Sequence, residues 1–166
     1  MRLTQYKPDP AYLYSHTSAA RLHGLVFLRD SPLIHVTCHS KPCAQRLGSG
    51  VRTHFIPVPE LDRQTLQGIP VTSLERTIID CARNLPTEDA LVLADQALAL
   101  GADRRIMADR LKGMVGHRGV VNARRVVELA DPRSESVAES RARLLFHQEN
   151  IPLPVPQWQV MTPLGP

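Results

Sequence analysis

The 166-residue chain has few aromatic residues, cysteines and long apolar runs. With seven aromatic side chains, any core must be built from leucine, valine, isoleucine and alanine. An odd set of three cysteines, at positions 38, 43 and 81, excludes a disulfide framework. No run approaches the roughly 18 to 20 apolar residues of a membrane span, and the N-terminus lacks the apolar segment of a signal peptide. We therefore expect a cytoplasmic protein without membrane contact.

The length and charge allow one or two domains and a weakly basic surface. At roughly 150 residues per domain, 166 residues lie between one domain and two. The net charge is +4, and 17 of the 20 basic residues are arginines. Ten basic and seven acidic residues lie in 101–166, which therefore carry most of the excess. This pattern fits either an ordinary solvated surface or a nucleic-acid-binding face.

The hydrophobic pattern predicts an α+β fold, with a small β-sheet followed by a helical bundle. A polar lead-in over 1–14 is followed by predicted strands at 32–40 and 51–58, the second lying at a sheet edge. Helical periodicity and helix-end signals predict six helices, at 17–23, 73–85, 87–101, 103–112, 120–130 and 134–150.

Several residues have a predicted structural role at helix ends. Gly24 and Gly101 follow helical segments and are expected to adopt the left-handed conformation that ends a helix. Thr87 is expected to cap the helix that begins after Pro86.

The segment from residue 72 has the clearest helix start. Thr72 and Glu75 have the spacing of a capping box, in which each side chain bonds a free backbone N–H of the first turn. Arg76 and Asp80 are four residues apart and are expected to form an ion pair on one helix face.

The histidines and cysteines between residues 35 and 43 invite a metal-binding interpretation. His35, Cys38, His39 and Cys43 are zinc-ligand types, but the second cysteine pair typical of structural zinc sites is missing. We therefore expect no complete metal site. The glycine-rich segment 113–119 lacks the strand and the Lys-Ser/Thr of a phosphate loop, and is expected to be a turn between helices.

The helix predicted at 134–150 carries acidic residues that admit two interpretations. Glu135 and Glu139 are four residues apart, and Glu139 can pair with Arg143, as on any solvated amphipathic helix. Alternatively, one carboxylate is a Mg²⁺ ligand, because Mg²⁺ prefers oxygen donors. Such a hydrolytic site needs two or more acidic ligands, and no acidic residue follows Glu149 in this chain.

An ordered series of motifs, each weak alone, resembles one group of bacterial proteins that is common in actinobacteria. Those proteins join an antitoxin region like AbiEi, of type IV toxin–antitoxin systems, to a C-terminal domain like the very-short-patch-repair endonucleases of the PD-(D/E)XK superfamily. The motifs are SHTSAARLHGL, IHVT, VRTHFIPV, GIPVTSLERTIIDCA, ALVLADQAL, HRG, ARRVVELADPRSESVAESRAR and LPVPQWQV, which together extend from about residue 14 to residue 160.

The resemblance implies a domain division and a partial nuclease site. Residues 15–131 would form the antitoxin-like domain, and 134–166 the first helix and strand of the endonuclease-like domain. Glu139 would match the helix acid of the nuclease, with Glu135 a less favoured choice. The winged helix-turn-helix and the catalytic aspartate strand of the family would lie outside this chain, which is expected to be truncated at both ends. Mg²⁺ would bind only to a full-length nuclease domain.

The function implied by the resemblance is antitoxin-like regulation by binding, without catalysis by this chain. DNA, a toxin or another protein is the expected partner. Two alternatives remain: a metal-dependent endonuclease if the native product is longer, and a decayed reading frame without function. The arginines expected to contact nucleic acid are Arg104, Arg105, Arg118, Arg124 and Arg125.

Overall fold

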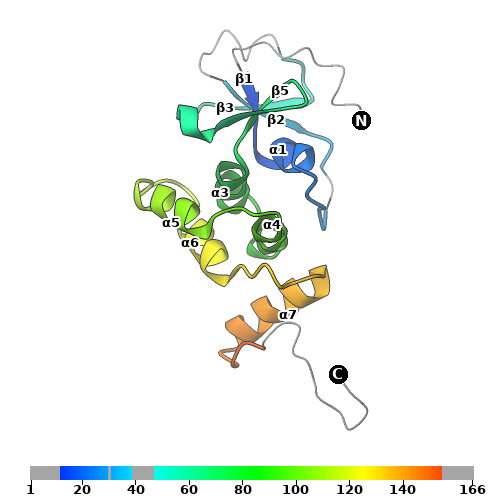
Figure 1. Ribbon diagram of the computed structural model, residues 1–166, viewed down its shortest axis with the longest axis vertical. Helices are drawn as coiled ribbons and strands as arrows, with labels where there is room; N and C mark the ends of the chain where they lie inside the picture. The colour runs from blue at the N-terminus through cyan, green and yellow to red at the C-terminus, as the bar shows by residue number, and fades with distance from the viewer. Residues whose placement is uncertain (1–11, 30, 39–46, 155–166) are drawn as a thin grey trace.

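The computed structural model describes residues 12–29, 31–38 and 47–154, which adopt the expected α+β fold. A five-stranded mixed sheet lies at one end, and the helices extend from it to α7 at the other end (Figure 1). The strands are β1 (Tyr12–Tyr14), β2 (Ile34–Cys38), β3 (Val51–His54), β4 (Arg63–Leu66) and β5 (Ile69–Thr72). The helices are α1 (His16–Leu22), α3 (Leu74–Asn84), α4 (Thr87–Ala99), α5 (Arg104–Lys112), α6 (Val120–Leu129) and α7 (Val137–Gln148), with a 3₁₀ turn at Glu60–Asp62.

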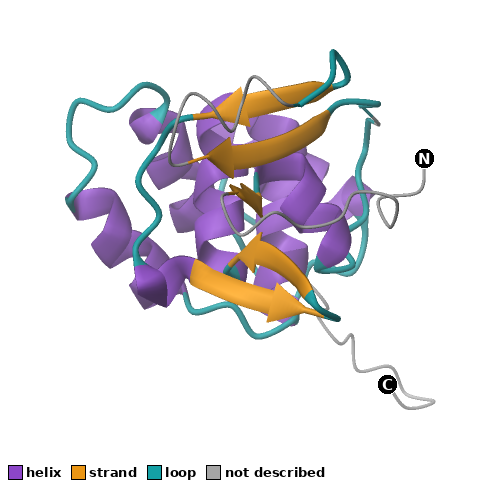
Figure 2. Cartoon of the chain, turned by 90° about the horizontal axis from the view of Figure 1, so that it is seen from above, coloured by secondary structure: helices purple, strands orange, loops and turns teal. Residues whose placement is uncertain are grey.

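The sheet has the order β3-β2-β1-β5-β4, so the short β1 lies at its centre. β1 is antiparallel to β2 and parallel to β5, whereas β3 is parallel to β2 and β4 is antiparallel to β5. The view from above shows the helices layered against the sheet (Figure 2). β3 is an edge strand, as predicted for the segment that begins at Val51.

Three strands, β1, β4 and β5, lie where the sequence pattern predicts none. β1 lies inside the predicted lead-in, yet its three residues Tyr12–Tyr14 are all buried. β4 and β5 form a hairpin whose turn residues, Gln67 and Gly68, have φ values of +50° and +79°. Positive φ at both positions matches the twist of a tight hairpin. Pro70, which cannot donate a ladder hydrogen bond, hid β5 because proline argues against a strand.

The glycine helix ends are confirmed. Gly24 has φ +85°, and Leu25 N–H donates to the carbonyl of Ala20 across the end of α1. Gly101 has φ +96°, and Ala102 N–H makes the equivalent bond at the end of α4. A hydrogen bond from a backbone N–H to the carbonyl five residues earlier defines the Schellman motif. It pairs a carbonyl that the end of the helix leaves without a partner.

The predicted capping box at Thr72 and Glu75 is wrong by one residue. Thr72 is the last residue of β5, so Ser73 caps α3 and accepts a hydrogen bond from Arg76 N–H at 3.2 Å. The Thr72 hydroxyl instead lies 2.7 Å from the Thr77 hydroxyl, and the Glu75 carboxylate accepts from Asp103 N–H.

The prediction for the α4 cap is also wrong. Pro86 is the N-cap of α4, and Thr87 is the first helical residue. The Thr87 hydroxyl donates to the side-chain oxygen of Asn122 on α6, so it joins two helices rather than closing one.

The core is aliphatic, as the composition predicts, and divides into two clusters. The larger cluster lies among the helices and includes the fully buried Ile78, Leu91 and Met107. The smaller one lies on the sheet and includes Tyr14 and Val36. Complete burial of an isoleucine or leucine side chain contributes about 1.5–3 kcal/mol.

Gly119 marks a close approach between the start of α6 and the end of α3. It has φ +76°, and a Cβ atom added there would overlap the backbone carbonyl of Arg83. Arg83 Nε also donates to the carbonyl of Arg118 at 3.0 Å. The position therefore excludes a side chain both by backbone conformation and by space.

Replacing Gly119 by alanine is expected to destabilise the fold by about 3 kcal/mol or more, because left-handed strain and overlap with the Arg83 carbonyl act together. Gly116→Ala is the matched control, since Gly116 has φ +80° but open space around it. The control should lose only about 1–2 kcal/mol. Urea unfolding measures both variants, and equal losses would contradict the proposed overlap.

Candidate functional site

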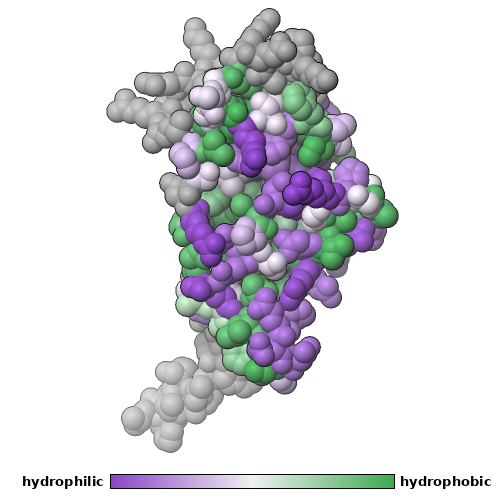
Figure 3. Space-filling view, turned by 180° about the vertical axis from the view of Figure 1, so that it is seen from behind, coloured by the Kyte–Doolittle hydropathy of each residue, from purple (hydrophilic) through white to green (hydrophobic). Residues whose placement is uncertain are grey.

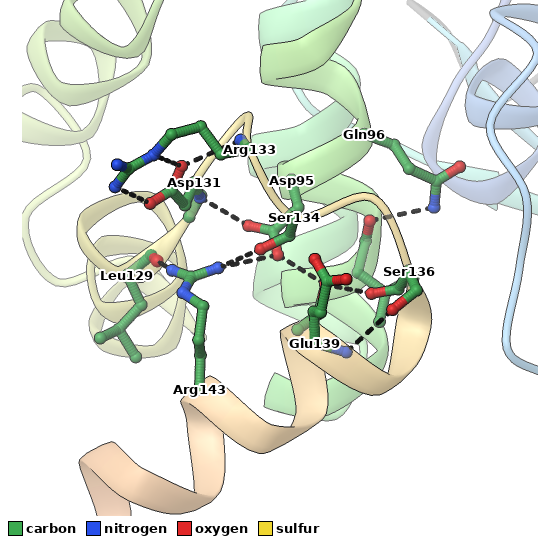
Figure 4. Close-up of polar contacts among 12 residues, drawn as sticks. Asp95, Gln96, Leu129, Asp131, Arg133, Ser134, Ser136, Glu139 and Arg143 are labelled. Carbon is green, nitrogen blue, oxygen red and sulfur yellow. Dashed lines mark hydrogen bonds and ion pairs between the residues drawn. The ribbon is translucent and has the colours of Figure 1, made fainter. Parts of the chain in front are cut away.

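Glu139 and Glu135 lie at the N-terminus of α7 and take part in closing it. Ser136 caps the helix by accepting from Glu139 N–H at 3.1 Å (Figure 4). A Glu139 carboxylate oxygen accepts from Glu135 N–H at 3.0 Å. This is a variant of the capping box in which the carboxylate reaches one residue beyond the cap. Glu139 therefore has a local structural task in this chain.

Arg143 does not form the expected ion pair with Glu139, because it pairs with Asp95 of α4. The Asp95 carboxylate is 1% exposed and accepts from the Ser140 hydroxyl at 2.6 Å, from Asp131 N–H at 2.7 Å and from Arg143 Nη1 at 3.1 Å (Figure 4). Burial raises the pKa of Asp95, and the hydrogen bonds from Ser140 and Asp131 oppose that rise.

The same arginine joins the segment before α7 to the end of α6. Arg143 donates to the hydroxyl of Ser134 at 2.7 Å and to the carbonyl of Leu129. The beginning of α7 is thus fixed to α4 and α6 by one buried polar junction. The assignment of 134–166 to an endonuclease-like domain stays a prediction, and residues 155–166 lie outside the described part of the chain.

Two of the five predicted nucleic-acid contacts are held at helix ends. Arg104 donates to the carbonyls of Val127, Glu128 and Ala130 at the end of α6. Arg124 donates to the carbonyl of Leu111 near the end of α5. Cationic side chains at these ends complement the partial negative charge of the helix C-terminus.

The other three predicted contacts differ in exposure. Arg105 on α5 and Arg118 in the turn before α6 are exposed, and Arg125 is half-buried. Residues 103–129 contain seven basic and three acidic residues, an excess equal to the net charge of the whole chain. The sequence of α5, α6 and the turn between them is therefore rich in positive charge, of which Arg110 is paired with Asp62.

A buried ionic network lies between the sheet and α3. Arg76 Nε donates to Asp80 at 2.9 Å, which confirms the predicted pair, and Arg76 Nη1 lies 3.5 Å from Asp62. Arg76 also donates to the carbonyl of Pro57, and Arg110 of α5 pairs with Asp62. Burial raises the pKa of Asp80, whereas the Arg76 guanidinium lowers it. A cavity of about 250 Å³ borders this network.

Three histidine rings meet where α1 begins beside β2 and β3. The His16 and His54 rings are stacked with centroids 3.6 Å apart, and His35 Nδ1 lies 3.0 Å from His54 Nε2. His16 Nδ1 lies 3.0 Å from the Ser15 hydroxyl, which accepts from the Thr37 hydroxyl at 2.9 Å. One nitrogen of each histidine lies within 4.8 Å of the others. In the described ranges, this is the one group of three histidine, cysteine or acidic side chains close enough to share a metal ion.

All three imidazoles are neutral at pH 7. The pKa of His16 is lowered to about 2, chiefly by burial and further by the charges of the neighbouring histidines, Arg76 and Arg83. Burial also lowers the pKa of both His35 and His54 to about 4, with Arg52 contributing at each. Neutral imidazole is the form that can donate a lone pair to a metal ion.

Proximity in the chain predicts a different group, in which His35 lies with Cys38, His39 and Cys43. Cys38 packs in the sheet cluster, while His39 and Cys43 lie outside the described residues. His54 is opposite Thr37 in the parallel β2–β3 register, which puts it on the same sheet face as His35. Without that register, residues 19 positions apart give no signal of contact.

Comparison with known proteins finds relatives but no family. Two uncharacterized proteins of Mycobacterium tuberculosis, one in each of two strains, are each 34% identical to this chain over 98 residues. The match covers 58% of this chain and 36% of each relative, so it spans just over a third of the relatives' length. No family model matches the chain.

None of the helices in the described ranges combines the length and apolar character needed to cross a bilayer.

Replacing Arg143 by methionine is expected to lower the free energy of unfolding by about 3–5 kcal/mol, because Asp95 would keep a buried charge without its cationic partner. Arg141→Met is the control two residues away. Arg141 is 56% exposed and pairs with Glu88, so its loss should change stability by less than about 1 kcal/mol. Urea unfolding compares the two, and similar losses would contradict the structural role of the Asp95 junction.

The histidine cluster predicts that metal-free protein loses stability as the pH falls from 7 toward 5. The unfolded histidines protonate near pH 6.5 but the folded ones near 4 or below, so acid favours the unfolded state, which binds more protons. Unfolding in EDTA at several pH values measures this dependence.

A His35→Gln, His54→Gln double variant should show a shallower dependence between pH 7 and 5. The exposed His117→Gln serves as its control and should keep the slope of the parent protein. An unchanged slope in the double variant would contradict the assignment of neutral buried imidazoles.

Proposed function

We propose that this chain is an antitoxin-like regulatory protein that binds nucleic acid through the basic α5–α6 surface, defined by Arg104, Arg105, Arg118, Arg124 and Arg125. The observation that carries the proposal is the concentration of the whole net positive charge in residues 103–129. Clustered arginines neutralise phosphates and release counterions, which drives binding without sequence specificity. The motif series that resembles AbiEi-like antitoxins supports the regulatory role.

The local contacts suit phosphate binding in two ways. Arg104 and Arg124 are held by backbone carbonyls, so less side-chain freedom would be lost on binding. Arg105 and Arg118 are exposed and can reach a phosphate directly. On the face seen from behind, hydrophilic side chains are interspersed with apolar patches (Figure 3).

The alternative of a metal-dependent endonuclease has less support in this chain. It requires Glu139 as a metal ligand, whereas the Glu139 carboxylate accepts a hydrogen bond from Glu135 N–H at the start of α7. It also requires further acidic ligands close to Glu139. In the part of the chain that the structure describes, no second and third ligand side chain lie close enough to Glu139 to complete such a site.

A mobility-shift titration with a short DNA duplex at two salt concentrations tests the proposal. With about four phosphate contacts, affinity should fall about 100-fold between 50 and 200 mM salt. The Arg105→Gln, Arg118→Gln double variant should lower the slope of log affinity against log salt by about 2.

The control removes the same charge elsewhere. Arg29 and Arg141 are exposed at 66% and 56% and both pair with Glu88, outside the basic surface. Arg29→Gln, Arg141→Gln should therefore keep the parent slope. Absence of any shift at low salt, or equal slopes for the two double variants, would overturn the proposed nucleic-acid interface.

A further inference from the structure

We propose that His16, His35 and His54 form a binding site for a divalent transition-metal ion, with Zn²⁺ as the best fit. The site would join the first turn of α1 to β2 and β3. It is independent of the basic α5–α6 surface and of the acidic residues on α7.

The spacing of the ring nitrogens is close to what such an ion requires. In a tetrahedral site with Zn–N distances near 2.0–2.1 Å, neighbouring ligand nitrogens are about 3.3 Å apart. His35 Nδ1 and His54 Nε2 are 3.0 Å apart, and the outer limit for the three ligand atoms is 4.8 Å. The His16 and His54 rings are stacked with 16° between their planes, so their lone pairs do not yet converge. One of these rings must rotate out of the stack to bring all three nitrogens into one coordination sphere, with a water molecule as the fourth ligand.

His16 supplies the second, independent observation. Its ring is 1% exposed, and its Nε2 atom is buried without a hydrogen-bond partner. Buried polar atoms are seldom left unpaired, so an unpaired buried nitrogen is a candidate metal ligand. His16 also has φ +52°, a left-handed conformation that is unfavourable for a residue with a side chain and that often marks functional sites.

The surroundings of His16 already resemble the outer shell of a metal site. With the ring proton on Nδ1, His16 donates to the Ser15 hydroxyl oxygen, which also accepts from the Thr37 hydroxyl. Metal-bound histidines typically donate their second ring nitrogen in this way, which fixes the tautomer and the ring orientation. The lone pair on His16 Nε2 is then free for the ion.

Metal binding requires a change of tautomer in one neutral ring. The proton shared by His35 Nδ1 and His54 Nε2 must leave that contact and occupy the other nitrogen of its ring, so that both atoms present lone pairs. The rings stay neutral and the net proton count is unchanged. Coordination bonds replace the histidine–histidine hydrogen bond.

An all-imidazole donor set selects the type of ion. Imidazole suits Zn²⁺, Cu²⁺, Ni²⁺ and Co²⁺, whereas Mg²⁺ and Ca²⁺ prefer oxygen ligands. The charges of four nearby arginines, Arg21, Arg52, Arg76 and Arg83, oppose any cation at the rings. The Asp80 carboxylate, which pairs with Arg76 at 2.9 Å and with Arg83 at 3.7 Å, offsets part of that charge. We therefore expect a zinc-type ion to bind and Mg²⁺ not to bind.

Titration of the full chain, purified without a histidine tag, with Co²⁺ and then Zn²⁺ tests the proposal. We expect one Co²⁺ per chain with the visible absorption of tetrahedral cobalt, displaced by one equivalent of Zn²⁺. We also expect a Zn²⁺-dependent rise in Tm that EDTA reverses and Mg²⁺ does not reproduce.

Variants distinguish binding at this site from binding by other histidines or by cysteine. His35→Gln and His54→Gln should each weaken Zn²⁺ binding at least 10-fold while retaining the circular-dichroism spectrum of the folded parent. His117→Gln and His147→Gln, at exposed positions, should bind as the parent does. Absence of Co²⁺ and Zn²⁺ binding by the parent would overturn the proposal, as would binding that survives in His54→Gln but is lost in Cys43→Ser.

Discussion

The buried pairing of Arg76 with Asp80 and Asp62 is the interaction on which the arrangement of sheet and helices depends. Arg76 and Asp80 belong to α3, whereas Asp62 lies in the 3₁₀ turn before β4. Burying a charge is unfavourable unless it is paired and hydrogen-bonded, so each of these groups requires the others in place. Ser73 N–H also donates to the Asp62 carbonyl at 2.8 Å, which fixes the start of α3 against the same turn.

A second buried charge is paired and hydrogen-bonded at the other end of the molecule. There the Asp95 carboxylate accepts from Ser140 and Arg143 of α7. The two junctions fix the sheet and α7 at opposite ends of the helical layer (Figure 1). The first junction also affects the histidine cluster, because Arg76 is among the groups that lower the pKa of His16. The candidate metal site and the main structural network are therefore electrostatic neighbours.

Local signals in the sequence predicted the elements whose causes are local. Gly24 and Gly101 end helices because the required left-handed conformation is a property of the residue itself, and Arg76 and Asp80 pair because helix geometry places them together. Tyr12–Tyr14 became a central strand only through its partners on both sides, which no local pattern encodes. The pairing of Arg143 with Asp95, and not with Glu139, also depends on the tertiary fold, because the two residues are 48 positions apart in the chain. The histidine cluster likewise required the β2–β3 register.

The most direct test of the account is X-ray absorption spectroscopy at the zinc edge on the zinc-loaded chain. The structure predicts a first shell of nitrogen and oxygen atoms near 2.0 Å, with the outer-shell scattering of three imidazole rings. That result would match an ion held by imidazole nitrogens, as His16, His35 and His54 would supply. A shell of sulfur atoms near 2.3 Å would contradict the account, because it would assign the ion to the cysteine-containing segment instead.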